Sequence, residues 1–299
     1  MSADGRHRFT AYLLLTASMT LVGSYVALSK PLVAAIPVFA LAFLRFGIAS
    51  VAMLPWTLPR PHEVPLTRRE HGLFFLMSFL GNFLFSICML SGVALTTATA
   101  AGVIMATIPA VVAIGSRLFL RERLTGRAIA AIALAIGGIA LLQFARGAQA
   151  SREATLLGNA LIFGAVVCEA SYVIIGKRLA ATRTPLRVSA LINLWGLALM
   201  APFGLWQLAR FPLASVSGAI WALLVFYSLA ASLFAVWLWM AGLKHVPANH
   251  AGVFTVALPI AATAVGVAFL GEQFTPLHAG ALLLAAGGAV LITTAPRAA

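Results

Sequence analysis

The chain is divided by short connectors into ten apolar runs, each close to 20 residues long. The runs cover approximately residues 10–28, 36–55, 72–92, 95–118, 127–144, 157–176, 188–208, 219–242, 248–270 and 277–294. A helix of roughly 20 apolar residues is long enough to cross the hydrocarbon core of a bilayer. The pattern therefore predicts an all-α integral membrane protein with ten transmembrane helices. The boundary between the third and fourth runs, near Gly92, is the least distinct.

The composition excludes an ordinary soluble domain. Hydrophobic residues make up 62% of the chain and charged residues only 9%, whereas a soluble domain carries roughly 25% charged residues. The net charge of +13 comes from Lys and Arg in short loops, not from one basic surface of the kind that binds nucleic acid. Cys88 and Cys168 lie inside apolar runs, with no Cys or His at the spacing of metal ligands. We expect the lipid bilayer as a partner, and no nucleic acid, cofactor or metal.

Two segments of the first half recur in the second half. Residues 24–34 and 171–181, which are 147 residues apart, share six of eleven positions, including Tyr25 with Tyr172. Residues 92–142 and 242–292, which are 150 residues apart, share sixteen of fifty-one positions, including Gly, Pro, Glu and Thr. The matches indicate a duplication, with a first repeat over residues 1–150 and a second over residues 151–299.

Each predicted repeat holds five spans, and five is an odd number. The second repeat must therefore enter the membrane in the opposite orientation to the first, which makes an inverted repeat. This architecture is typical of secondary transporters, whose substrate sites lie near the membrane midplane where the repeats meet.

The distribution of Lys and Arg predicts the orientation. With the N-terminus in the cytoplasm, the inner segments hold fifteen of these residues and the outer segments four, while Arg45 lies within a span. The positive-inside rule then places both termini in the cytoplasm of a multi-pass protein of the cell (inner) membrane.

Several stretches resemble the drug/metabolite transporter superfamily, in particular the ten-span group built from two EamA domains. They are GSYVALSK in the first span, ALRFGIAS in the second, ATAAGVIMATIPAVVAIGSRLFLRERLT across the fourth and NHAGVFTVALPIAATAVGVAFLGEQFT across the ninth. Within the group, the chain is most similar to the YddG-type exporters of aromatic and other amino acids. The resemblance implies alternating access around a central cavity lined mainly by spans 1, 3, 4, 6, 8 and 9.

The expected function is export of amino acids and related small metabolites by a monomer or weak dimer. A multidrug or organic-cation exporter of the same fold is the main alternative. A membrane enzyme is disfavoured because the only aspartate is Asp4 and the chain has neither H-E-x-x-H nor G-x-S-x-G. A channel is disfavoured because no carbonyl-filter motif or dense ring of charge is present.

Two charged residues inside spans are candidates for function or for structural pairing. Glu169 is the only acid well inside a span, where a charged group is costly and a functional role is the default hypothesis. Its carboxylate could bind a substrate ammonium or a coupling proton, could accept hydrogen bonds from Ser171 and Tyr172, or could pair with Arg45. For Arg45 the structural reading is favoured, with its guanidinium bonded to neighbouring helices.

The remaining candidates are aromatic and small polar residues at membrane depth. Together with Glu169, the predicted cavity residues are Tyr25, Asn82, Ser86, Met105, Tyr172, Tyr227, Ser232, Trp237, His250 and Phe254, and Ser228 and Trp239 belong to the same span-eight group. Pro109 and Pro259 are predicted to bend the fourth and ninth spans and to act as gating hinges. Thr125 and Thr275 are predicted to cap the helices that follow, with Glu122 and Glu272 near the electropositive helix starts.

Overall fold

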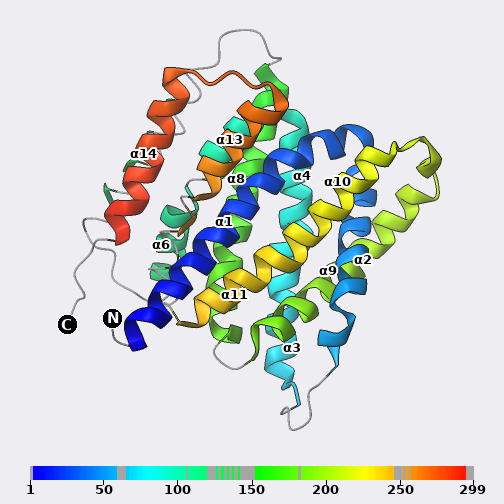
Figure 1. Ribbon diagram of the computed structural model, residues 1–299, viewed down its shortest axis with the longest axis horizontal. Helices are drawn as coiled ribbons and strands as arrows, with labels where there is room; N and C mark the ends of the chain where they lie inside the picture. The colour runs from blue at the N-terminus through cyan, green and yellow to red at the C-terminus, as the bar shows by residue number, and fades with distance from the viewer. Residues whose placement is uncertain are drawn as a thin grey trace.

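The computed structural model describes residues 3–58, 65–105, 107–119, 152–180, 183–245 and 257–293, and also residues 126, 129–130, 133–134, 137, 141, 251 and 254–255. All regular elements in these ranges are helical (Figure 1). They are α1 (Ala3–Ala35), α2 (Val38–Thr57), α3 (Arg68–Ser78), η1 (Phe79–Leu84), α4 (Phe85–Leu95), α5 (Ala98–Met105), α6 (Ile108–Phe119), α8 (Arg152–Ala180), α9 (Pro185–Leu208), η2 (Leu213–Ser215), α10 (Gly218–Ser228), η3 (Leu229–Phe234), α11 (Ala235–His245), α13 (Ala257–Leu270) and α14 (Pro276–Thr293). The prediction of an all-helical protein is confirmed for this part of the chain.

Seven helical stretches are long and apolar enough to cross a membrane. They are Phe9–Ala35, Val38–Thr57, Arg68–Leu95, Ala100–Phe119, Leu156–Gly176, Pro185–Leu208 and Gly218–His245, and two shorter apolar helices cover Ile260–Leu270 and Pro276–Gly288. These nine stretches coincide with predicted spans one to four and six to ten. The predicted fifth span, at 127–144, lies almost entirely outside the described residues. The described helices thus establish a multi-pass protein, while the count of ten stays a prediction.

Two long helices are interrupted by π-helical segments at equivalent places. η1 joins α3 to α4, and η3 joins α10 to α11. A π turn accommodates one residue more than an α turn, because its hydrogen bonds join residues five apart. η1 and η3 begin and end 150 residues apart, and so do the helices that flank them. The 150-residue offset of the sequence repeat therefore extends to a backbone irregularity that the sequence analysis did not predict.

Two glycines mark equivalent helix crossings. A Cβ atom on Gly92 of α4 would lie 2.7 Å from Cδ1 of Ile162 on α8, and one on Gly242 of α11 would lie 2.7 Å from Cγ of Leu15 on α1. Leu15 and Ile162 are themselves 147 residues apart. Since only a residue without a side chain lets the backbones approach this closely, α4 packs on α8 in the way that α11 packs on α1.

α2 and α9 form the contact between the corresponding second helices of the two halves. Nδ2 of Asn193 on α9 donates hydrogen bonds to the carbonyl oxygen of Phe46 (3.1 Å) and to Oγ of Ser50 (2.8 Å) on α2. Phe46 and Asn193 occupy positions 147 residues apart. This buried polar contact fixes the rotation of α2 and thereby the direction of Arg45, the residue before Phe46.

The two prolines predicted to bend spans lie at helix starts. Pro109 is the second residue of α6, which follows the end of α5 at Met105, and Pro259 is the third residue of α13. In the first turn of a helix the missing backbone N–H removes no hydrogen bond. The predicted bends and gating roles at these prolines stay predictions, because residues 106 and 256, which precede the two helix starts, lie outside the described residues.

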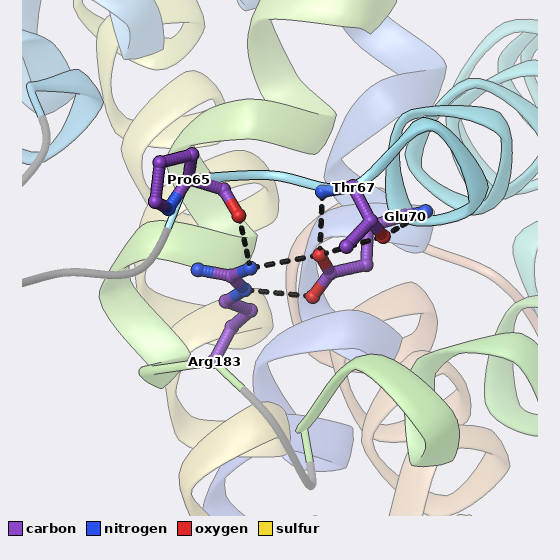
Figure 2. A network of polar contacts seen from close by, with 4 residues as sticks. All are labelled: Pro65, Thr67, Glu70 and Arg183. Carbon is purple, nitrogen blue, oxygen red and sulfur yellow. Dashed lines mark hydrogen bonds and ion pairs between the residues drawn. The ribbon is translucent and has the colours of Figure 1, made fainter.

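Arg183 and Glu70 form the tighter of two ion pairs among the described residues (Figure 2). Nε and Nη2 of Arg183 donate to the two carboxylate oxygens of Glu70 at 2.8 and 2.7 Å, and Nη2 also donates to the carbonyl oxygen of Pro65 at 3.1 Å. Glu70 in turn completes a capping box with Thr67 at the start of α3. We call these four residues the Arg183 latch; it ties the loop after α8 to the start of α3.

A looser ion pair joins Lys30 near the end of α1 to Glu272, which follows α13. Nζ of Lys30 lies 3.6 Å from Oε1 of Glu272 and donates to the carbonyl oxygen of Thr96 at 3.1 Å. Oγ1 of Thr275 accepts a hydrogen bond from the backbone N–H of His278, which confirms the predicted cap of α14. Glu122 and Thr125, predicted to play the same parts in the first half, lie outside the described residues.

Candidate functional site

A partly open cavity lies among helices from both halves of the chain. A water-sized sphere can be centred within about 40 Å³ of it, and the surrounding empty space of about 450 Å³ includes the part that opens to the outside. Its described lining residues are Ser18, Met19, Val22, Tyr25, Arg45, Gly81, Asn82, Phe85, Glu169, Tyr172, Ala231, Ser232, Ala235, Val236 and Trp239. These residues come from α1, α2, the η1–α4 region, α8 and the η3–α11 region.

The cavity lies near the middle of the helices that surround it. Asn82 and Ser232 are the fourth residues of η1 and η3, and each is central in a helical stretch of 28 residues. At a rise of 1.5 Å per residue, each lies about 20 Å from either end of its stretch. The cavity is therefore about midway along both helical stretches.

Most of the lining residues are related by the sequence repeat. The pairs, at offsets of 147 or 150 residues, are Val22 with Glu169, Tyr25 with Tyr172, Gly81 with Ala231, Asn82 with Ser232, and Phe85 with Ala235. The cavity is thus built from equivalent positions of the two halves. Its two charged residues have no charged equivalent in the other half: Val22 occupies the position equivalent to Glu169, and Ile192 the position equivalent to Arg45.

Glu169 projects from α8 among groups that do not neutralise it. Within the described residues, no hydrogen bond or ion pair engages its carboxylate. The expected bond from Ser171 does not form, because Oγ of Ser171 donates to the carbonyl oxygen of Val167 on its own helix at 2.9 Å. Tyr25 and Tyr172 line the same cavity as Glu169.

Arg45 is 3% exposed and lines the same cavity. Nη2 donates to Oγ of Ser86 at 2.7 Å, and the guanidinium lies 4.1 Å from the ring centroid of Phe46 and 5.8 Å from that of Tyr227. No ion pair joins Arg45 to Glu169 in the described structure. The alternative of a permanent Arg45–Glu169 pair is therefore wrong for this conformation.

Several buried polar atoms around the cavity have no hydrogen-bond partner among the described residues. They are the hydroxyl of Tyr172, Oγ of Ser232, Nε1 of Trp239 and Nε of Arg45. Leaving a buried donor or acceptor unsatisfied costs about 1–3 kcal/mol, and native proteins contain few such groups. Four around one cavity indicate a surface suited to a polar ligand or to water.

The structure brings five of the predicted site residues to the cavity wall and two more beside it. Tyr25, Asn82, Glu169, Tyr172 and Ser232 line it. Nδ2 of Asn82 is already engaged, since it donates to the carbonyl oxygen of Ile192 at 2.7 Å. Ser86 accepts the bond from Arg45, and the ring of Tyr227 packs edge-on against that of Tyr25 at 5.5 Å.

The other predicted residues lie elsewhere. Met105 is buried at the end of α5, Trp237 is half-buried outside the cavity, and Phe254 stacks on Tyr12 at 5.0 Å. His250 lies outside the described residues. Described residues from the fourth and ninth spans do not line the cavity, whereas the second span contributes Arg45. The second span thus joins the expected set, and the contribution of the fourth and ninth spans stays a prediction because residues 106, 252–253 and 256 lie outside the described residues.

Most of the residues that the sequence analysis missed are small or apolar: Ser18, Met19, Val22, Gly81, Phe85, Ala231, Ala235 and Val236. The repeat offset could have identified some of them, because it relates Val22 to the candidate Glu169. Of the two tryptophans named in the span-eight group, Trp239 lines the cavity and Trp237 does not. Among the described residues, no group of three or more His, Cys, Asp and Glu could hold a metal ion.

Comparison with known proteins agrees with this architecture. The model of the EamA-like transporter family matches residues 9–144 and 156–294. The uncharacterized transporter YetK of Bacillus subtilis is 35% identical over 280 residues, which cover 93% of this chain and 85% of that protein. The uncharacterized transporter YyaM of the same organism is 22% identical, covering 83% of this chain and 82% of YyaM. One crystal structure, 21% identical, shares the fold with a TM-score of 0.64 over 98% of this chain and 97% of its own.

Proposed function

Because the chain belongs to the EamA-like transporter family, we propose that it is a secondary transporter that exports amino acids and related small metabolites by alternating access. The observation that carries the proposal is the cavity at mid-depth, whose wall is built from equivalent residues of the two halves. Substrate sites of secondary transporters with internal repeats lie near the membrane midplane at the interface of the repeats. The mixture of charge, hydroxyl groups and aromatic rings suits a small amphiphilic molecule.

The two halves act as inverted repeats of five spans in this proposal, with boundaries at 1–150 and 151–299. The shared offset of η1 and η3 and the paired crossings at Gly92 and Gly242 support it. The division of the family match into residues 9–144 and 156–294 is consistent with it. Rocking of one half against the other would expose the cavity to each side in turn, with Pro109 and Pro259 as hinges.

The proposed orientation has both termini in the cytoplasm, and it rests on the excess of Lys and Arg in the segments on that side. Single cysteines in a cysteine-free background, at residue 183 and at residue 210, test it by labelling in intact cells. An impermeant maleimide should label residue 210 and should reach residue 183 only after the cells are opened. Labelling of residue 183 from outside would reverse the assignment.

Flux into liposomes tests the function itself. Purified protein should mediate saturable flux of labelled amino acids, and substrate on the opposite side should accelerate that flux. Saturation and acceleration identify a carrier; their absence with fast flux would identify a channel. Flux limited to bulky organic cations would replace the proposal by the organic-cation alternative, which the unpartnered Glu169 carboxylate beside aromatic rings favours.

A matched pair of variants connects the flux to the cavity. A Cβ atom at Gly81 would lie 2.4 Å from Cδ2 of Tyr172, whereas one at Gly47 on α2 would have no atom within 4 Å. Gly81→Leu should therefore fill the cavity and remove most of the saturable flux, while Gly47→Leu should retain it. Equal flux in both variants would show that the substrate does not pass through this cavity.

A further inference from the structure

The cavity presents two opposite charges that are separated from each other. Arg45 lines it from α2 and Glu169 from α8, and no ion pair joins them in the described structure. Tyr25 lines the same cavity as the two charged residues. A buried charge without a partner is strongly unfavourable. The cavity wall therefore offers a positive and a negative site, each lacking the counter-charge that the other could have supplied.

The guanidinium of Arg45 retains donors for a ligand. Arginine has five N–H donors in a planar fork that matches a carboxylate. Here Nη2 is engaged with Ser86, while Nε is buried without a partner. The ring of Phe46 at 4.1 Å covers one face of the guanidinium and leaves its edge as the hydrogen-bonding side. These contacts hold Arg45 in a fixed orientation without neutralising it.

The two charges also remove the symmetry that the repeat gives to the rest of the cavity. Four pairs of uncharged lining residues occupy equivalent positions: Tyr25 with Tyr172, Gly81 with Ala231, Asn82 with Ser232, and Phe85 with Ala235. None of these pairs carries a charge that would fix the orientation of a ligand with one positive and one negative end. The position equivalent to Glu169 in the first half is occupied by Val22, and the position equivalent to Arg45 in the second half is occupied by Ile192. A ligand with one positive and one negative end would consequently bind in a single orientation.

We propose that Arg45 binds the carboxylate and Glu169 the ammonium group of one amino-acid zwitterion, which spans the cavity between α2 and α8. The proposal rests on the proposed function and assigns its two substrate-binding charges. The uncharged polar groups beside them, the hydroxyl of Tyr172, Oγ of Ser232 and Nε1 of Trp239, provide further hydrogen bonds to the same ligand. Met19, Val22 and Val236 leave an apolar surface for its side chain.

Competition in liposomes tests the proposal on the unmodified protein. The probe is labelled L-leucine; the competitors are L-leucine, L-leucine methyl ester, which lacks the carboxylate, and N-acetyl-L-leucine, which lacks the ammonium. Since a hydrogen bond to a charged group is lost in each analogue, both should compete at least about tenfold less well than L-leucine. Competition by either analogue equal to that of L-leucine would overturn the assignment. This series needs no variant, so a failure of variants to fold does not affect it.

Two variants then separate the charges. Arg45→Gln should weaken L-leucine binding at least about tenfold while leaving the affinity for the methyl ester nearly unchanged, and Glu169→Gln should do the same with N-acetyl-L-leucine. A structural role would lower all affinities together. Arg210→Gln, at an exposed arginine stacked on Trp206, is the matched control. Thermal stability is measured alongside, and a stable Arg45→Gln variant that loses both ligands equally would refute the role of Arg45.

The test distinguishes failure of the inference from failure of the proposed function. Saturable leucine flux without discrimination between the analogues would retain amino-acid transport and reject the two binding roles. Absence of leucine flux together with flux of organic cations would reject both.

Discussion

The starts of α3 and α10 are equivalent positions of the 150-residue repeat, and they lie at opposite ends of the bundle (Figure 1). Each is capped by a hydroxyl side chain: Oγ1 of Thr67 accepts from the N–H of Glu70 at 3.2 Å, and Oγ of Ser217 accepts from the N–H of Ile220 at 3.4 Å. Only the first start carries an acid three residues later, and that acid binds Arg183. The helix cap is therefore present at both equivalent positions, whereas the ion pair with Arg183 is present only at the start of α3.

We infer that ion pairs between helices stabilise the two ends of the bundle to different extents. At the end of the Arg183 latch, the two charged side chains are 7% and 14% exposed, and two hydrogen bonds below 3 Å join them. At the other end, the Lys30 side chain is 37% exposed and lies 3.6 Å from Glu272. Because water screens exposed pairs and long side chains lose entropy on pairing, the second contact is the weaker one. We expect the bundle to open more readily at the Lys30 end.

Removal of the latch should give the largest effect. Arg183→Ala deletes two short bonds to Glu70 and one to Pro65, and it should lower the free energy of unfolding by about 2 kcal/mol, within the range for hydrogen bonds to charged groups. Thermal unfolding of the purified protein in detergent measures the loss. Arg183→Lys, which retains the charge without the planar fork, should lose about half as much.

The double variant Glu70→Gln with Arg183→Ala tests whether the two residues act as a pair. Residues in one ionic network show coupling energies of about 0.5–3 kcal/mol, so the two single losses should not add. Additive losses would mean that each side chain stabilises the fold through other contacts, and the latch would then not exist as a unit.

The two equivalent caps should differ by a smaller amount. Thr67→Ala should cost about 1 kcal/mol, since the residue caps α3 and also orients Glu70, whereas Ser217→Ala should cost about 0.5 kcal/mol. Measured in the same detergent, the pair serves as its own control because both substitutions remove a cap at the same position of the repeat. Equal losses would show that the surroundings of Glu70 add nothing to the cap.

The smallest effect is expected at the opposite end. Glu272→Gln leaves the bond from Lys30 to the carbonyl oxygen of Thr96 in place and should cost no more than about 0.5 kcal/mol, as for other exposed ion pairs. Added salt should remove the difference between wild type and variant. A loss as large as that of Arg183→Ala would mean that the two ends are fastened equally.

The helices could be predicted from the sequence to a considerable extent, because a segment in lipid must be apolar over its whole length. The apolar run predicted at 188–208 corresponds to α9 (Pro185–Leu208). The helix cap predicted at Thr275 is present. Such features depend on neighbouring residues alone. The π segments could not be predicted, because FLGNFL and LAASLF contain no residue that is incompatible with an α-helix.

The cavity was harder to predict, because it depends on how each helix is rotated about its own axis. Trp237 and Trp239 have similar chemistry, but Trp239 lines the cavity together with Ser232 and Trp237 does not. Arg45 was taken for a structural residue because the sequence does not tell whether a guanidinium bonded to Ser86 also borders open space. Only the packing of α2 on α9 answers that question.

η1 and η3 also constrain the history of the chain. A π turn accommodates one residue more than an α turn, and a residue inserted in one half after a duplication would be absent from the other half. Here the extra residue occurs at the same place in both. If a duplication produced the two halves, the insertion is older than the duplication and was already present in the five-helix ancestor. With the proposed inverted arrangement, such an ancestor would have formed this cavity by pairing with a second, oppositely inserted copy of itself. A relative consisting of a single half should therefore contain the π segment and be active only as a dimer.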